Sequence, residues 1–214
     1  MSIQFGSGVF SIQETSLFLG LSNPKVKRWL DEIWNTRITS AKNETYSWGD
    51  GRYKTLNFLT LIEFYTFYQL RNQNISVKKI IMAHDVIQEK LNTPYPFASS
   101  KILTDGCKVL FEEDNSIIDA EPGLQTNIQG VILPFCTRIE FGDDFLAKRF
   151  WPRGSNVNVV IDPSHQFGQP TVPNTNILAR QLYNLYKGGE SPEFIAALYK
   201  ISKKEVFDSI SLFN

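Results

Sequence analysis

The stretch SIQETSLFLGLSNPKVKRWL, residues 11–30, carries the start and stop residues of two short helices joined by one glycine. Ser11 and Glu14 match a capping box, in which the serine oxygen accepts a backbone N–H and the glutamate reaches back to the serine N–H. Gly20 can adopt the left-handed conformation that closes a helix, and Ser22 is a suitable N-cap for the next helix. The stretch therefore predicts two helices folded across a tight turn.

Two such helices fit a helix-turn-helix, in which the second helix enters the major groove of DNA and the first crosses the backbone. The exposed start of the second helix would then contact DNA, because Asn can pair with adenine while Arg and Lys can pair with guanine or phosphate. A packed helix pair with a solvated basic face is the alternative interpretation. The predicted buried stripe of the second helix is Val26, Trp29, Leu30 and Ile33, and its predicted DNA contacts are Ser22, Asn23, Lys25, Lys27 and Arg28.

The segment TYSWGDGRYKT, residues 45–55, predicts a β-hairpin. Aromatic and polar residues alternate around Gly49-Asp50-Gly51, which has the composition of a tight turn. A hairpin that follows such a helix pair is typical of a winged helix-turn-helix, whose wing lies on the DNA backbone. Arg52 and Lys54 are the predicted phosphate contacts of this wing.

The rest of the chain has helical patterns on both sides of a β-rich middle. Short β-type runs between residues 101 and 141, separated by Gly, Pro and Asn, predict a small sheet. We therefore expect an α+β fold that is mainly helical. Further helices are predicted over 57–72, 76–91, 177–186, 191–199 and 202–213.

The helix pair, the hairpin and the segment LNFLTLIEFYTFYQLRNQ resemble the N-terminal half of MerR-type winged helices. They resemble more closely the DNA-binding half of VapB-type antitoxins, and ISVKKIIMAHDVIQEKLNTPYPFASSKILTDG continues that second resemblance. Pro94 and Pro96 interrupt helical structure, so the long coiled-coil helix of MerR regulators is not predicted. The resemblance implies a DNA-binding domain over 1–98 with a small β-rich connecting region over 99–152.

Residues 153–214 resemble a small three-helix, homeodomain-like domain that recurs in bacterial antitoxins. This chain has Asn174-Thr175-Asn176 where that family has Gly-Thr-Arg, so the arginine contact is absent, although Asn174 can still form a left-handed turn. The last two helices form a second helix-turn-helix candidate, but their weak positive charge favours a packed helical hairpin. The matching positions are Ile161-Asp162-Pro163, Gly168-Gln169-Pro170, Val172, Thr175, Gly189 to Glu193, Ile195-Ala196, Tyr199 and Glu205-Val206.

Composition excludes several other classes of protein. The 214 residues are 42% hydrophobic, with 22 basic and 22 acidic side chains, so we expect a folded core and only local basic surfaces. Cys107, Cys136, His84 and His165 are too scattered for a structural zinc site, and we predict no metal, cofactor or functional disulfide. Because no secretory signal or apolar span of about 20 residues is present, we expect a cytoplasmic protein without membrane contact.

Enzymatic motifs are also absent from the sequence. It has no glycine-rich phosphate loop, nucleophile elbow or metal-ligand cluster, and Asp162 with His165 is more simply a cap beside a surface residue. We therefore expect a protein that is not an enzyme. The resemblance implies an antitoxin that binds a PIN-like ribonuclease toxin and represses its own operon as a homodimer on double-stranded operator DNA. A stand-alone MerR-like regulator without a toxin partner is the alternative.

Overall fold

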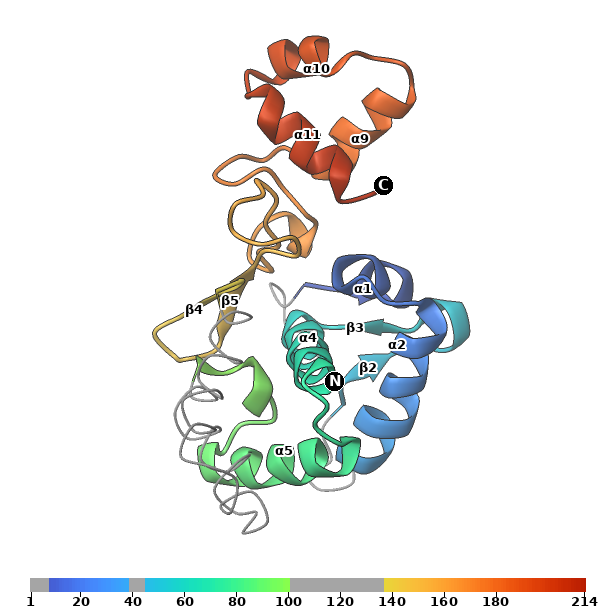
Figure 1. Ribbon diagram of the computed structural model, residues 1–214, viewed down its shortest axis with the longest axis vertical. Helices are drawn as coiled ribbons and strands as arrows, with labels where there is room; N and C mark the ends of the chain where they lie inside the picture. The colour runs from blue at the N-terminus through green and yellow to red at the C-terminus, as the bar shows by residue number, and fades with distance from the viewer. Residues whose placement is uncertain (1–7, 39–44, 101–136) are drawn as a thin grey trace.

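The computed structural model describes residues 8–38, 45–100 and 137–214 (Figure 1). The fold is mainly helical with small sheets, as the sequence predicts for an α+β protein. The molecule is elongated. The elements before residue 100 lie toward one end, with the strand pair of residues 139–150 beside them, and the helices of residues 179–211 lie at the other end.

The predicted helix pair is present as α1 (Ile12–Leu19) and α2 (Asn23–Trp29). The Ser11 hydroxyl accepts the N–H of Glu14 at 3.2 Å, and the Glu14 carboxylate accepts the N–H of Ser11 at 2.9 Å, which completes the capping box. Gly20 closes α1 with a φ of 65°, as predicted. Helix α2 continues directly into a π-helix, η1 (Leu30–Ile38), which extends the buried stripe of the second helix.

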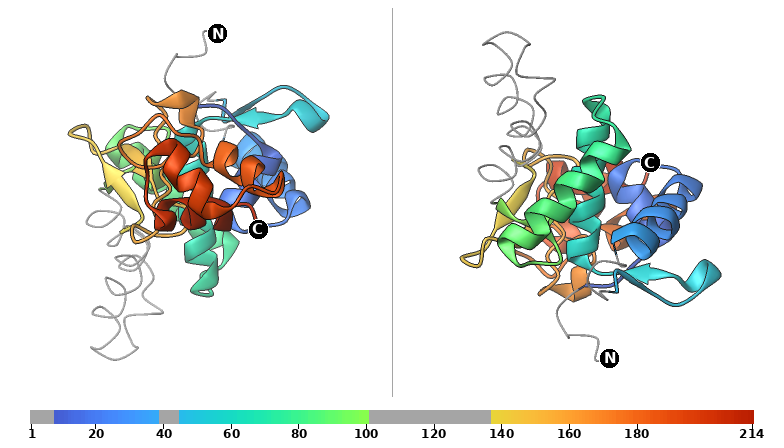
Figure 2. Two further views of the ribbon diagram at one scale, coloured as in Figure 1. Left: turned by 90° about the horizontal axis from the view of Figure 1, so that it is seen from above. Right: turned by 90° about the horizontal axis from the view of Figure 1, so that it is seen from below.

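A three-stranded sheet lies beside this pair, with strand order β1-β3-β2 and antiparallel neighbours. Its strands are β1 (Phe10–Ser11), β2 (Ser47–Trp48) and β3 (Thr55–Leu56). The predicted hairpin is confirmed by the pairing of β2 with β3, and a 3-10 turn, η2 (Gly51–Tyr53), lies between the two strands. Figure 2 shows that this hairpin projects from the body of the molecule.

Two helices of fifteen residues complete the N-terminal part, and both were predicted. Helix α4 (Phe58–Asn72) begins after the N-cap Asn57, and α5 (Val77–Leu91) begins after the N-cap Ser76, whose side chain accepts the N–H of Lys79. The chain then crosses these helices through a short 3-10 turn, η3 (Pro96–Ala98), which is buried.

The β-rich middle is described only from residue 137 onward. Strands β4 (Ile139–Phe141) and β5 (Ala147–Phe150) pair antiparallel. The predicted strands between 101 and 136, with Cys107 and Cys136, lie outside the described residues. A 3-10 turn, η5 (Gln166–Gly168), precedes the C-terminal helices.

The three predicted C-terminal helices are present as α9 (Ala179–Lys187), α10 (Pro192–Tyr199) and α11 (Lys203–Ser211). Ser191 caps α10, and Ser202 forms a capping box with Glu205 at the start of α11. Asn174 adopts the left-handed conformation that the sequence allows it, with a φ of 60°.

The described apolar residues form two clusters. The larger cluster extends from Phe10 to Phe150 and also includes Ala179 of α9 and Leu212 at the end of α11. The smaller cluster joins the three C-terminal helices to one another, with Val172, Leu182, Ile195, Ala196, Val206 and Ile210. The C-terminal helices therefore have a core of their own and are also packed on the rest of the chain.

Candidate nucleic-acid interface

The start of α2 presents polar and basic side chains to solvent. Ser22, Asn23, Lys27 and Arg28 are exposed, while Val26 and Trp29 of the same helix are buried. Within the described residues, Lys27 and Arg28 have no hydrogen bond or ion pair, so both cations are available to a ligand. The Ser22 side chain makes no capping hydrogen bond, although its backbone holds the N-cap position.

Lys25 differs from its neighbours because its ammonium group is stacked on two aromatic rings. It lies 5.0 Å from the centre of the Trp29 ring and 5.1 Å from that of Tyr68, and its side chain is half-buried. A cation held over aromatic faces is stabilised where it is. Lys25 thus contributes positive charge to this surface while it also packs α2 against α4.

The hairpin carries one exposed basic residue and one that is held in an ion pair. Arg52 is exposed, and its guanidinium donates a hydrogen bond of 2.6 Å to the hydroxyl of Tyr53, itself 68% exposed. Lys54 instead forms an ion pair with Asp31 of η1, and only 16% of its side chain is exposed. Of the two predicted wing contacts, Arg52 is therefore the accessible one, while Lys54 fixes the hairpin to the helix that follows α2.

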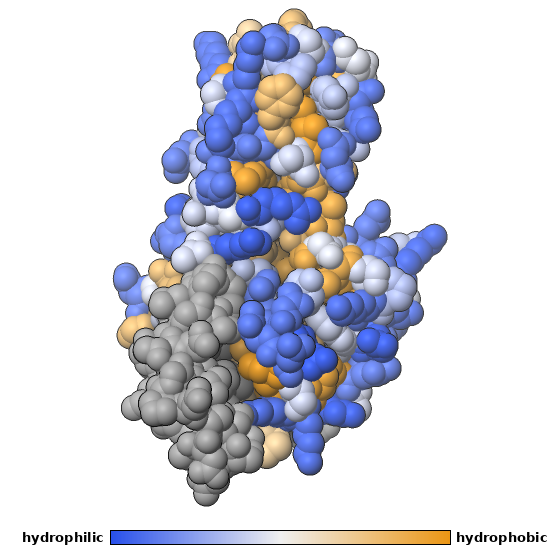
Figure 3. Space-filling model, viewed as in Figure 1, coloured by the Kyte–Doolittle hydropathy of each residue, from blue (hydrophilic) through white to orange (hydrophobic). Residues whose placement is uncertain are grey.

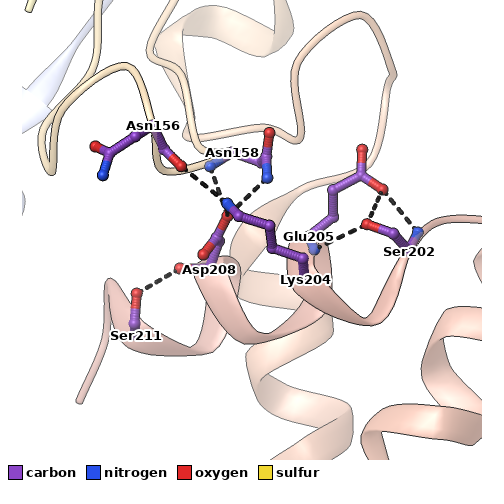
Figure 4. A network of polar contacts seen from close by, with 7 residues as sticks. All are labelled: Asn156, Asn158, Ser202, Lys204, Glu205, Asp208 and Ser211. Atoms are coloured by element: carbon purple, nitrogen blue, oxygen red, sulfur yellow. Dashed lines mark hydrogen bonds and ion pairs between the residues drawn. The ribbon is translucent and has the colours of Figure 1, made fainter.

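The basic residues at the start of α11 are engaged in intramolecular contacts. Lys203 forms an ion pair of 2.9 Å with Glu193 of α10. Lys204 donates to the backbone oxygen of Asn156 at 2.8 Å and to the Asp208 carboxylate at 2.6 Å (Figure 4). These contacts agree with a packed helical hairpin, the interpretation that the weak local charge favours.

Asp162 and His165 are tied into a turn. Asp162 is buried, accepts the N–H of Ser164 at 2.9 Å and lies 2.8 Å from the guanidinium of Arg149. Burial alone would raise the pKa of Asp162, but these hydrogen bonds outweigh it and hold the pKa below its ordinary value. The His165 ring lies 2.9 Å from the backbone oxygen of Thr175.

Neither a metal cluster nor a membrane span is found in the described part of the chain. Across residues 8–38, 45–100 and 137–214, no three or more His, Cys, Asp or Glu side chains are grouped so that they could hold a metal ion. No helix within these ranges is both long enough and apolar enough to cross a bilayer.

Sequence reasoning missed a buried polar cluster around Glu63. Glu63 and His84 are fully buried, and the Glu63 carboxylate lies 2.8 Å from Nε2 of the His84 ring. The same carboxylate accepts the N–H groups of Phe97 at 2.7 Å and Ala98 at 3.2 Å. These contacts join α4, α5 and η3 and involve no residue of α2, so they contribute to the packing of these three elements.

The chain is similar to one family model, one named protein and one solved structure. Residues 159–211 match the model of the family described as "Protein of unknown function (DUF433)". The protein described as "Putative antitoxin VapB45" from Mycobacterium tuberculosis strain H37Rv is 20% identical, over 98% of this chain and 95% of the relative. The crystal structure of Rv2018 from Mycobacterium tuberculosis superposes with a TM-score of 0.71 at 18% identity, over 94% of this chain and 96% of that one. The last likeness shows a shared fold.

Proposed function

We propose that this protein is the antitoxin of a type II toxin–antitoxin pair, which neutralises a PIN-like ribonuclease toxin and represses its own operon. The observation that carries the proposal is the similarity to a protein named as an antitoxin, because it extends over nearly the whole of both chains. A match restricted to residues 159–211 would support only a shared module.

The DNA-binding half of the proposal is a winged helix-turn-helix within residues 1–98. Gly20 supplies the left-handed turn, α2 is the recognition helix, and the β2–β3 hairpin is the wing. Asn23, Lys27 and Arg28 are exposed at the helix and Arg52 at the wing, where base edges and phosphates would be met. Ser22 and Lys25 lie beside these contacts, and Lys54 orients the wing.

The toxin-binding half of the proposal is assigned to the C-terminal helices, because large apolar side chains are open to solvent there. Phe194 and Leu198 of α10 are 51% and 55% exposed, and Phe207 of α11 is 53% exposed. Figure 3 shows apolar side chains at the surface of this end of the molecule. Phe194 and Leu198 are four residues apart and so lie on one face of α10, and exposed apolar patches are typical of protein-binding surfaces. A homodimer would match a two-fold operator.

A tagged pull-down from cells that express the chain with its native gene neighbourhood tests the proposal. A small PIN-like nuclease recovered in near-equal amount would support it. Recovery of the protein alone, still bound to its own promoter, would leave the stand-alone regulator.

The toxin-binding surface is tested by Leu198→Asp with Phe207→Asp. This double variant is expected to lose binding of the nuclease but to retain binding of DNA. The matched control is Met82→Asp with Val86→Asp, which alters two exposed apolar residues of α5.

The recognition helix is tested separately by Lys27→Ala with Arg28→Ala. Both side chains are exposed, so the double variant is expected to fold normally. It should bind a promoter duplex at least tenfold more weakly, because the loss of one base-contacting residue costs about 1–3 kcal/mol of binding free energy. Lys78→Ala with Lys90→Ala removes the same charge from exposed positions on α5 and should bind as the wild type does. Unchanged binding by a well-folded Lys27 and Arg28 variant would remove α2 from the interface.

A further inference from the structure

A groove of about 700 Å³ separates the helix pair from the C-terminal helices. Ser11 and Gln13 at the start of α1 line one side together with Asn23 at the start of α2. Arg180 and Tyr183 of α9 line the other side. Asn23 is one of the proposed DNA contacts, so the groove borders the surface that DNA bound by α2 would occupy.

Helix α9 carries a basic and aromatic stripe, of which Arg180 and Tyr183 border the groove. Arg180, Tyr183 and Lys187 are spaced three and four residues apart, so they lie on one face of the helix. The Lys187 ammonium lies 5.5 Å from the centre of the Tyr183 ring. Arg180 and Lys187 are both exposed.

The guanidinium of Arg180 is held in place without being neutralised. Its central carbon lies 4.2 Å from the centre of the Phe213 ring, a stacking contact that orients the planar group. Among the residues that the structure describes, Arg180 has no carboxylate or carbonyl partner. Its N–H groups are therefore free, and a planar guanidinium of this kind matches the geometry of a phosphate.

The acidic side chain in the groove is already engaged. One oxygen of Glu14 accepts the N–H and hydroxyl of Ser11, at 2.9 and 2.8 Å, and the other accepts the Gln169 side chain at 3.2 Å. Free hydrogen-bond donors face the groove from α9, while the carboxylate opposite is turned to its own capping box. The positive charge without an ion-pair partner, among the described residues that line the groove, is therefore that of Arg180, on the side of the groove formed by α9.

We propose that the basic stripe of α9, with Arg180 as its main contact, holds the phosphate backbone of the DNA that α2 binds, so that the C-terminal helices form a second wall of the DNA-binding site. This assignment rests on the proposed function, because it needs α2 to be the recognition helix. In a helix-turn-helix the first helix crosses the backbone, and here the start of α1 faces Arg180 across the groove.

The test is the salt dependence of binding by the full chain to a labelled duplex from its own promoter, measured by fluorescence anisotropy. Arg180→Ala is expected to lower the slope of log K against log salt by roughly 0.9 for each phosphate that the variant no longer neutralises. It should weaken binding to an unrelated duplex of equal length by a similar factor, because phosphate contacts carry no sequence information. Arg180→Lys should recover part of the slope.

Lys148→Ala is the matched control, since Lys148 is an exposed cation on β5, at the other side of the molecule from α1 and α2 (Figure 1). A slope for Arg180→Ala equal to that of wild type and of Lys148→Ala would overturn the inference. If Lys27→Ala with Arg28→Ala still weakens binding in that case, only the role of α9 fails. If the wild-type chain binds neither duplex, the proposed DNA-binding function fails with it.

Discussion

Glu63 is a buried carboxylate that is the hydrogen-bond partner of three other groups. Two backbone N–H groups and the His84 ring converge on it, and neither Glu63 nor His84 is exposed. Glu63→Ala would leave these groups unpaired in the core, so the free energy of unfolding should fall by about 3–5 kcal/mol, the cost of breaking a buried pair. Urea denaturation followed by circular dichroism measures this decrease.

Glu63→Gln separates the removal of hydrogen bonds from a simple change of volume. The glutamine oxygen can still accept from Phe97 or Ala98, so this variant should lose less stability than Glu63→Ala. Glu89→Ala on the exposed side of α5 should change stability by less than about 0.5 kcal/mol. Equal stabilities for all three variants would contradict the role given to Glu63.

Asp162 should make the stability of the protein depend on pH in the acidic range. Burial opposes its charge, but hydrogen bonds from Ser164 and Arg149 hold its pKa below the ordinary value of 3.8. A carboxyl whose folded pKa is depressed stabilises the folded state above the unfolded pKa, and this contribution is lost as pH falls through the folded pKa. Asp162→Asn should therefore be less stable than wild type at neutral pH.

The difference between wild type and Asp162→Asn should shrink as the pH falls below 3.8. Urea midpoints measured from pH 7 to pH 3 give the comparison. A difference in midpoint that stays constant across this range would show that Asp162 contributes by shape alone.

The turn between α1 and α2 depends on one backbone conformation. Gly20 has a φ of 65°, and a Cβ added there would meet nothing within 4 Å. Gly20→Ala therefore has a conformational cost alone, and we expect a decrease of about 1 kcal/mol in the free energy of unfolding. Gly20→Asn should lose less, because asparagine tolerates the left-handed region. Thermal unfolding of both variants tests this prediction. Equal losses of stability in Gly20→Ala and Gly20→Asn would show that the left-handed conformation is not the cause.

Elements with local stop and start residues were predictable from the sequence. Ser11 with Glu14, Ser76, and Ser202 with Glu205 each cap a helix through contacts three residues apart, and these helices begin where predicted. The conversion of the second helix into a π-helix over Leu30–Ile38 was not predicted, because its hydrogen-bond pattern leaves no distinct mark on the apolar spacing.

Side-chain contacts between residues close in sequence could also be predicted, whereas contacts between distant residues could not. Lys25 lies four residues before Trp29, so its stacking could be expected from helix spacing. The Lys54–Asp31 and Glu63–His84 pairs join residues more than twenty positions apart, and only the folded structure brings them together. As a result, the predicted DNA contacts include two lysines that have intramolecular roles, while Asn23, Lys27, Arg28 and Arg52 remain exposed.

At the scale of the molecule, sequence patterns predict the C-terminal helices but not their attachment. Ala179 and Leu212 belong to the larger cluster, while Ile195 and Val206 belong to the smaller one. Arg153 also donates to the backbone oxygen of Leu17 in α1. The groove beside Asn23 exists because of this attachment, which depends on the tertiary arrangement of several elements and has no local motif.

Two core substitutions should distinguish attachment of the C-terminal helices from their own folding. Leu212→Ala and Ile195→Ala each truncate a fully buried side chain. Each should lower the free energy of unfolding of the cluster to which the residue belongs by about 2–5 kcal/mol. Because Leu212 packs in the cluster shared with α1, Leu212→Ala should raise hydrogen–deuterium exchange both in α1 and in the C-terminal helices. Ile195→Ala should raise exchange in α9 to α11 and leave α1 protected. Full protection of α1 in Leu212→Ala would mean that the C-terminal helices are held to the rest of the chain by other contacts, and that the wall of the groove formed by α9 does not depend on this core.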